Sequence, residues 1–142
     1  MALNRTHITA IVIFIVIAVV GSGLLTGGAV TTDVDFSVRS VSMPEKILAG
    51  QTVRPAVTFE NSGSISAGSV SWKLLVLTSG GGLAVSKDGR TYLSAHGIAT
   101  EDLGPWDLAR GSYTTHLWVD YQQEHAERDE GNNLYTMAFK VV

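Results

Sequence analysis

Carboxylate side chains gather near the end of the chain, at a spacing that could hold a cation. Asp120, Glu124, Glu127, Asp129 and Glu130 fall within eleven residues. Calcium binds six to eight oxygens that converge on one point, but the EF-hand spacing D-x-[DN]-x-[DN]-G is absent. The same residues fit a solvated hairpin loop before the last strand, which is the interpretation that we favour. The calcium candidates are Asp120, Glu127, Asp129 and Glu130, and no organic cofactor is indicated.

One histidine, His125, lies inside this acidic stretch, whereas His7, His96 and His116 are scattered along the chain. An imidazole among carboxylates could ligate zinc or act as a pH sensor. A single histidine in a charged loop more commonly is only solvated. The histidines therefore give a hypothesis of a site at His125, with the solvated side chain as the simpler interpretation.

The remaining patterns argue against an enzyme. The chain has no cysteine, which excludes disulfides, thiolate metal sites and thiol catalysis. It has no G-x-S-x-G motif. The Gly-rich stretch "SGGGLAVSKDGR" is not followed by a predicted helix that could bind a phosphate, so it predicts a hairpin tip. A net charge of −3 gives no electrostatic attraction for nucleic acid. We therefore expect no catalytic residues and no nucleic-acid partner.

A loop tryptophan, Trp106 in "DLGPWDL", has two interpretations. It could be an exposed contact for a carbohydrate or a neighbouring subunit. It could also be a plug that covers one end of the fold, which we favour because large aromatic side chains are mostly buried.

The elements that must position these residues are β-strands, because apolar residues alternate with polar ones from Asp33 onward. Pro55 suggests an edge strand or a bulge, and turn signals such as Ser79–Gly82, Lys87–Gly89 and Gly131–Asn133 separate the runs. About seven short strands predict an antiparallel β-sandwich. The predicted inward-facing residues are Val34, Phe36, Val38, Val53, Pro55, Val57, Phe59, Val70, Trp72, Leu74, Val76, Tyr113, Thr115, Leu117, Val119, Tyr135, Met137, Phe139 and Val141.

Two segments resemble a known family. These are "DFSVRSVSMPEKILAGQTVRPAVTFENSGSISAGSVSWKLLV" and "GSYTTHLWVDYQQEHAERDEGNNLYTMAFKVV", the second with its Glu-x-Asn-Asn before the last strand. They resemble the cell-adhesion-related CARDB family, and the resemblance covers about residues 33–142, although residues 80–108 depart from it. It implies an immunoglobulin-like sandwich that acts as an extracellular structural and adhesive module without catalytic residues.

The N-terminal segment is hydrophobic and carries no Asp, Glu, Lys or Arg from Thr6 to Thr32. Its densest part, Ile8–Val20, would span roughly 20 Å as a helix, short of a ~30 Å hydrocarbon core, whereas continuing to Val30 gives about 35 Å. Three interpretations stay open: a secretory signal peptide, a retained anchor with its N-terminus in the cytoplasm, and a pilin-type helix. In composition the segment resembles the N-terminal helix of archaeal pilins and archaellins, without the glutamate of bacterial type IV pilins.

The sequence therefore predicts a mainly β chain: residues 1–32 form one long hydrophobic α-helix and hinge, and residues 33–142 form the immunoglobulin-like sandwich. We expect an extracellular filament or surface-assembly subunit, in which helices of many copies form the core and sandwiches form the sheath. The helix is membrane-embedded before assembly. The alternative is a single-span anchored module at the cell surface that binds a polysaccharide or a protein. The predicted assembly residues are Ile8, Ile11, Ile15, Val19, Gly21, Gly23 and Leu24.

Overall fold

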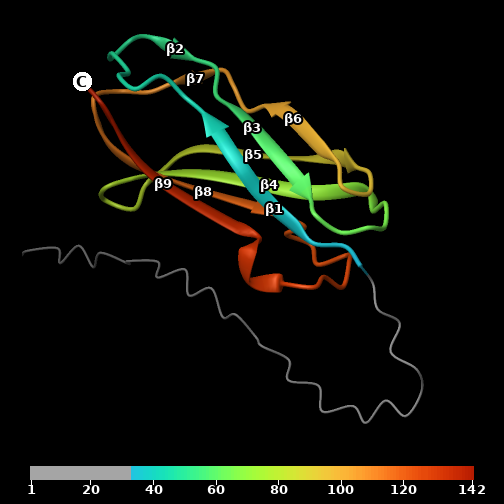
Figure 1. Ribbon diagram of the computed structural model, residues 1–142. Coiled ribbons are helices and arrows are strands. Elements are labelled where there is room, and N and C mark those ends of the chain that lie inside the picture. Colours follow the sequence, from blue (N-terminus) through green and yellow to red (C-terminus); the bar gives the residue numbers. More distant parts are fainter. Residues whose placement is uncertain (1–32) are drawn as a thin grey trace, which may run out of the picture.

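The computed structural model describes residues 33–142, which fold into nine strands and one short 3-10 turn (Figure 1). The elements are β1 (Phe36–Ser42), β2 (Thr52–Val53), β3 (Ala56–Asn61), β4 (Gly68–Thr78), β5 (Leu83–Leu93), β6 (Ile98–Asp102), β7 (Trp106–Asp107), β8 (Gly111–Val119), η1 (Glu130–Asn132) and β9 (Leu134–Val141).

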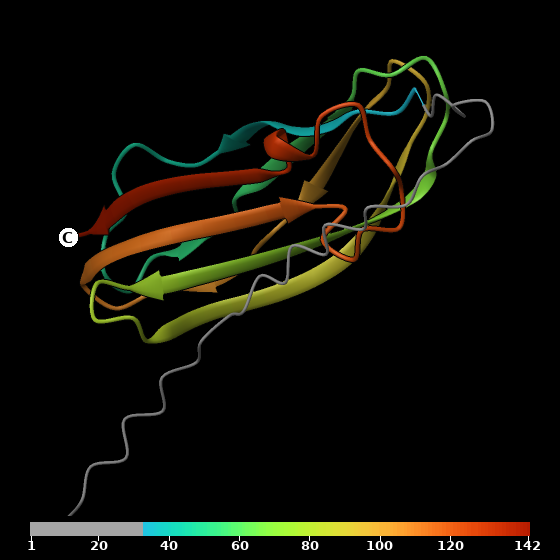
Figure 2. The ribbon, with the colours of Figure 1, turned by 90° about the horizontal axis from the view of Figure 1, so that it is seen from below.

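The strands form two layers that face each other, as the view in Figure 2 shows. One layer is a three-stranded sheet in the order β1-β3-β6, and the other is a four-stranded sheet in the order β5-β4-β8-β9. All pairs in these sheets are antiparallel. A small β2-β7 ribbon closes one end. The predicted antiparallel sandwich is therefore confirmed for the described residues.

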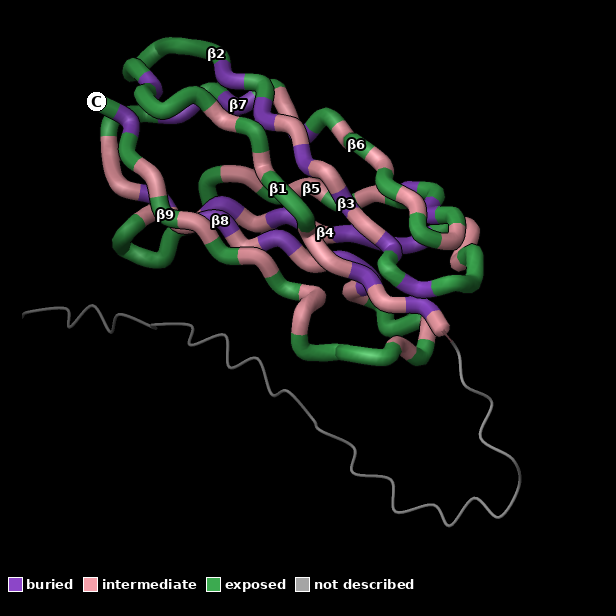
Figure 3. The backbone as a smooth tube through the Cα atoms, in the orientation of Figure 1, coloured by how far each residue is buried: buried purple, intermediate pink, exposed green. Residues whose placement is uncertain are grey.

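The core lies between the layers because successive strand residues point to opposite faces. Val70, Trp72, Leu74 and Val76 of β4 are buried, and the same alternation runs along β8. Figure 3 shows this alternation as buried segments that recur along the central strands. In β9 the predicted inward residues are only half-buried apart from Val141, since β9 is an edge strand.

Two details of the predicted strands were wrong. The run "TVRPAVTFEN" is not one strand, because β2 pairs with β7 and β3 pairs with β1 and β6. Pro55 lies between β2 and β3, where its ring removes a donor and its carbonyl accepts from Leu103 N at 2.8 Å.

The second correction concerns Lys87–Gly89, which is not a turn but the middle of β5. Gly89 is the cross-strand partner of Trp72, and a Cβ at Gly89 would lie 2.7 Å from Trp72 Cζ2. The glycine therefore makes room for the indole rather than for a reversal of the chain. The true hairpin tip is Ser79–Gly82, as predicted.

The sandwich has two distinct ends. The chain enters at Asp33, beside the β8–β9 loop, and leaves at Val142 at the opposite end (Figures 1 and 2). We call these the Asp33 end and the Val142 end. The β4–β5 hairpin and the β2-β7 ribbon lie at the Val142 end.

The predicted N-terminal helix and hinge lie outside the described residues. This includes the candidate assembly residues Ile8, Ile11, Ile15, Val19, Gly21, Gly23 and Leu24. Within residues 33–142, no helix has the length and apolar character needed to cross a membrane.

Candidate functional site

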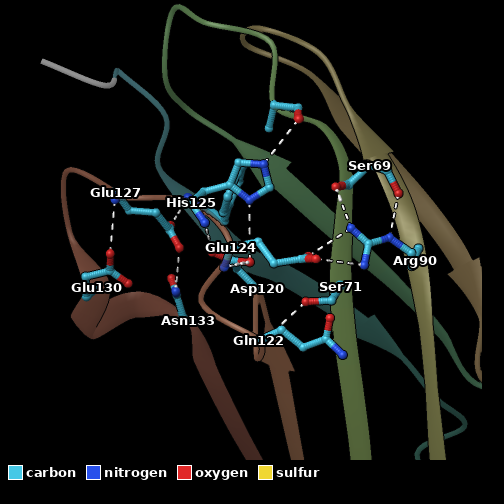
Figure 4. Close-up of polar contacts among 12 residues, drawn as sticks. Ser69, Ser71, Arg90, Asp120, Gln122, Glu124, His125, Glu127, Glu130 and Asn133 are labelled. Carbon is cyan, nitrogen blue, oxygen red and sulfur yellow. Dashed lines mark hydrogen bonds and ion pairs between the residues drawn. The ribbon is translucent and has the colours of Figure 1, made fainter. Parts of the chain in front are cut away.

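The polar side chains that the sequence singled out meet at the Asp33 end, in the loop that joins β8 to β9 (Figure 4). Asp120 organises this loop. Its side chain is fully buried, and its two oxygens accept from Glu124 N and His125 N, each at 3.1 Å. Asp120 has a φ of +48°, and its own N–H donates to Ser71 O at 2.6 Å. The carboxylate therefore accepts hydrogen bonds from backbone N–H groups that would otherwise have no protein acceptor in this tight turn.

His125 lies against this carboxylate and is mostly buried. Its Nδ1 is 3.5 Å from Asp120 Oδ1, and its Nε2 is 3.3 Å from Ala67 O. The imidazole also meets the ring of Phe36 edge-on, with centroids 5.3 Å apart. His125 therefore joins the loop to the first strand and to the start of β4, and it is not the freely solvated side chain that the sequence favoured.

Glu127 reaches the first strand directly. One carboxylate oxygen accepts from Phe36 N at 2.7 Å, and the other accepts from Asn133 Nδ2 at 2.6 Å. Burial raises the pKa of Glu127 to about 7, and the nearby charges of Glu130 and Asp120 act in the same direction. The two donated hydrogen bonds oppose this rise but do not cancel it.

This pKa predicts how stability depends on pH. The folded state holds the Glu127 proton more tightly than the unfolded state between about pH 4.5 and 7, so the stability contribution of Glu127 falls as pH rises through this window. We expect the stability of Glu127→Gln, relative to wild type, to improve by up to about 1 kcal/mol from pH 5 to pH 8, after allowance for partial solvent screening. Urea unfolding of both proteins at the two pH values measures this difference. A difference that does not change with pH would contradict the assignment.

The segment before β1 is held by a set of contacts that we call the Asp33–Phe36 latch. Asp33 forms an ion pair with Arg128 and accepts from the N–H and hydroxyl of Ser64. Asp35 accepts from Asn132 Nδ2 at 2.9 Å and from Ser62 Oγ at 2.8 Å. Hydrogen bonds to Ser64 first, and then to Arg128, lower the pKa of Asp33 to about 2. The contacts come from two sides, the β3–β4 turn and the β8–β9 loop.

A second ion pair ties the β8–β9 loop to the four-stranded sheet. Arg90 of β5 donates from both terminal nitrogens to the carboxylate of Glu124, at 2.8 and 3.2 Å, and its Nε donates to Ser69 Oγ. This arrangement lowers the pKa of Glu124 and raises that of Arg90. Glu124 is therefore committed to a structural contact with β5.

Trp106 and Trp118 have different environments. Trp106 is 1% exposed and its indole N–H donates to Leu103 O at 2.7 Å, so the favoured interpretation as a plug is confirmed. Trp118 instead points outward from β8 and stacks on His116, with ring centroids 5.8 Å apart. Leu134 lies opposite Trp118 on β9 and is 48% exposed. The alternation along β8 places Trp118 on the outer face, and no sequence pattern singled it out as a surface feature.

Comparison with known proteins decides the family. The family model described as CARDB matches residues 33–137. The chain belongs to the CARDB family. This family is associated with the cell surface, which the sequence resemblance had led us to expect. No curated protein matches the sequence.

Several solved structures share the fold. A domain from Methanosarcina acetivorans, provisionally described as part of a cell-surface protein, is 25% identical, with a TM-score of 0.60 over 78% of this chain and 93% of that one. The CARDB domain of a Pyrococcus furiosus protein, described as in complex with di-metal ions, is 20% identical, with a TM-score of 0.58 over 77% of this chain and 94% of that one. A β-glucosidase from Listeria innocua has a similar fold over only 16% of its length, at 12% identity and a TM-score of 0.54 over 76% of this chain.

The four calcium candidates of this CARDB domain each accept hydrogen bonds from different partners. Asp120 bonds the loop backbone, Glu127 bonds Phe36 and Asn133, and Asp129 accepts from Gly131 N at the start of η1. Glu130 accepts from Glu127 N at 3.0 Å. Among the described residues, no three His, Cys, Asp or Glu side chains form a group that could hold a metal ion. Calcium binding by these residues stays the less favoured of the two interpretations of the sequence.

Proposed function

We propose that the chain is a structural and adhesive module of the cell surface, in which the hydrophobic segment of residues 1–32 holds the CARDB domain at the membrane. The observation that supports this most directly is the arrangement of the two ends. The chain enters at Asp33, where the latch fixes it, while the Val142 end points the other way. A domain tethered at Asp33 presents its Val142 end and its sheet faces outward.

The charges flanking the hydrophobic segment agree with this orientation. Arg5 precedes the segment, and Asp33 and Asp35 follow it, so the positive-inside rule favours a cytoplasmic N-terminus and a domain outside the cell. The partner in this proposal is a surface polysaccharide or another surface protein. On the outer face of the four-stranded sheet, the half-buried Trp118 and His116 lie beside the exposed Leu134 and supply aromatic and apolar area for such a contact.

A second candidate function is a filament subunit of pilin or archaellin type, in which the helices of many copies build the core. One observation favours it. Large exposed apolar side chains lie at both ends of the domain, and head-to-tail contacts between unlike ends generate filaments. At the Asp33 end these are Ile65, Tyr92, Ile98 and Leu134, and at the Val142 end they are Leu48, Leu83 and Val142.

Strand addition is a poor route to such a filament. The long edge strand β5 carries Lys87 on its inner face, opposite Leu74, and Lys87 Nζ donates to Gly104 O. An inward-pointing charge discourages a second chain from extending the sheet. Strand addition at the β5 edge is therefore disfavoured, and a filament built through the N-terminal segments and the domain ends does not need it.

Fractionation of cells that produce the full chain tests both functions. The anchored module predicts that the protein stays with membranes, dissolves in detergent as a monomer, and reacts with a membrane-impermeant reagent on intact cells. Filaments of the same mass-identified subunit in shed material would instead support the filament function. Recovery in the soluble cytoplasmic fraction would contradict both, and N-terminal sequencing would settle whether a leader is removed.

A further inference from the structure

The first residues of the domain form hydrogen bonds to segments on both sides, in addition to those of the β1 strand. The carbonyl of Asp33 accepts from Ile65 N at 3.1 Å, and the carbonyl of Asp35 accepts from Ser62 N at 2.9 Å. On the other side, the carbonyl of Val34 accepts from Arg128 N at 3.0 Å. These backbone bonds add to the side-chain contacts of the latch, so residues 33–35 are bound from two directions before the β1 ladder begins at Phe36.

The close approach on the β3–β4 side depends on Gly63. A Cβ at Gly63 would lie 2.0 Å from Asp33 O and 2.6 Å from Val34 Cα. The backbone of the β3–β4 turn therefore packs directly on the backbone of Asp33 and Val34. A side chain at position 63 would push these two stretches of chain apart.

The direction of the chain determines how a pull on this segment acts. Because Asp33 and Val142 lie at opposite ends, tension between the N-terminal segment and the Val142 end runs along the strands. It slides β1 along β3, so the bonds between Phe36–Ser42 and Ala56–Asn61 resist together rather than open one after another. The latch lies ahead of this ladder, and its contacts must break before β1 can move.

We propose that the Asp33–Phe36 latch is a force-resisting clamp that keeps the domain folded when the N-terminal segment is under tension. The inference rests on the proposed function for its biological setting, since a tethered surface module is pulled when its partner moves. The Asp33–Arg128 ion pair of the latch is partly solvent-exposed, with Arg128 57% and Asp33 31% exposed, and exposed ion pairs contribute little to equilibrium stability. The hydrogen bond between Asn132 and Asp35 is part-buried. The effect of these contacts is expected in the rate of unfolding under force, which depends on the barrier to unfolding.

A pulling experiment on the full chain tests the clamp, with handles at residues 1 and 142 and the hydrophobic segment in detergent. The test variant carries Arg128→Ala and Asn132→Ala, which remove two side-chain contacts of the latch and leave the Arg128–Val34 backbone bond. The control is Arg54→Ala, which removes a more exposed ion pair with Asp102 at the Val142 end, away from the latch. Full unfolding of residues 33–142 should lengthen the chain by roughly 350 Å.

At a fixed force, the double variant is expected to unfold about tenfold faster than wild type, and Arg54→Ala within about twofold of wild type. In urea without force, the double variant and the control should lose similar, small amounts of stability. Equal unfolding rates under force for the double variant and wild type would overturn the proposal. If the double variant does not fold, Asn132→Ala alone is subject to the same comparison. Because purified protein is pulled, a failed clamp leaves the cell-surface function to be judged by fractionation.

Discussion

Trp106→Ala is expected to lower the free energy of unfolding by about 3–5 kcal/mol, the largest effect of any substitution considered for this chain. The indole is almost completely buried, donates to Leu103 O and stacks on Phe139, with ring centroids 6.2 Å apart. It also lies in β7, which pairs with β2 at the Val142 end. Truncation would leave a large cavity and a carbonyl without its donor, and would loosen the ribbon that closes this end.

Urea unfolding of the full chain in detergent, followed by circular dichroism, measures the effect. Trp118→Ala is the matched control, because Trp118 has the same side chain but faces outward from β8. Trp118 is half-buried on the outer face, so its loss is expected to cost clearly less than the loss of Trp106. Similar losses for the two variants would contradict the assignment of Trp106 as a core plug.

Asp120→Ala is expected to have the second largest effect, a loss of about 2–3 kcal/mol. The substitution leaves the N–H groups of Glu124 and His125 without their acceptor in a partly buried position and removes the partner of the imidazole. Alanine also tolerates the φ of +48° at this position less well than aspartate. The loop should therefore lose its turn, and with it the hydrogen bond from Phe36 to Glu127.

Two further variants separate these causes. Asp120→Asn keeps the preference for positive φ and one oxygen acceptor, so it should recover part of the loss. Asp129→Ala removes an exposed carboxylate from the same loop, with a single bond to Gly131 N, and should cost clearly less. If Asp120→Ala and Asp129→Ala are equally stable, Asp120 does not organise the loop.

The strands could be predicted because burial on one face imposes a period of two. Val70 to Val76 and Tyr113 to Val119 show this period clearly, and the structure buries those residues. The position of Gly89 could not be predicted, because Lys-Asp-Gly is a common turn signal and only its pairing with Trp72 explains it. A glycine that accommodates a cross-strand aromatic leaves no local pattern in the sequence.

The acidic stretch was predictable as a loop but not as a network. Asn132 and Asp35 are 97 residues apart in sequence, and Glu127 and Phe36 are 91 apart, so no local spacing joins them. The family's Glu-x-Asn-Asn signature marked the place, and the structure gives its two asparagines separate partners. Asn132 holds Asp35, whereas Asn133 holds Glu127. The stretch that first suggested a metal site fastens the start of the domain to its end.

In the proposed function, the Asp33 end of the domain faces the membrane that holds the N-terminal segment. Two positions on strand β5 can report which end of the domain is nearer the membrane. Tyr92 and Leu83 lie at the two ends of this strand, roughly 30 Å apart, and both side chains are well exposed. The chain has no cysteine, so Tyr92→Cys and Leu83→Cys can each carry one fluorophore. In liposomes with nitroxide-labelled lipid headgroups, the proposed orientation predicts stronger fluorescence quenching for a fluorophore at position 92 than for one at position 83. Equal quenching, or stronger quenching at position 83, would contradict it.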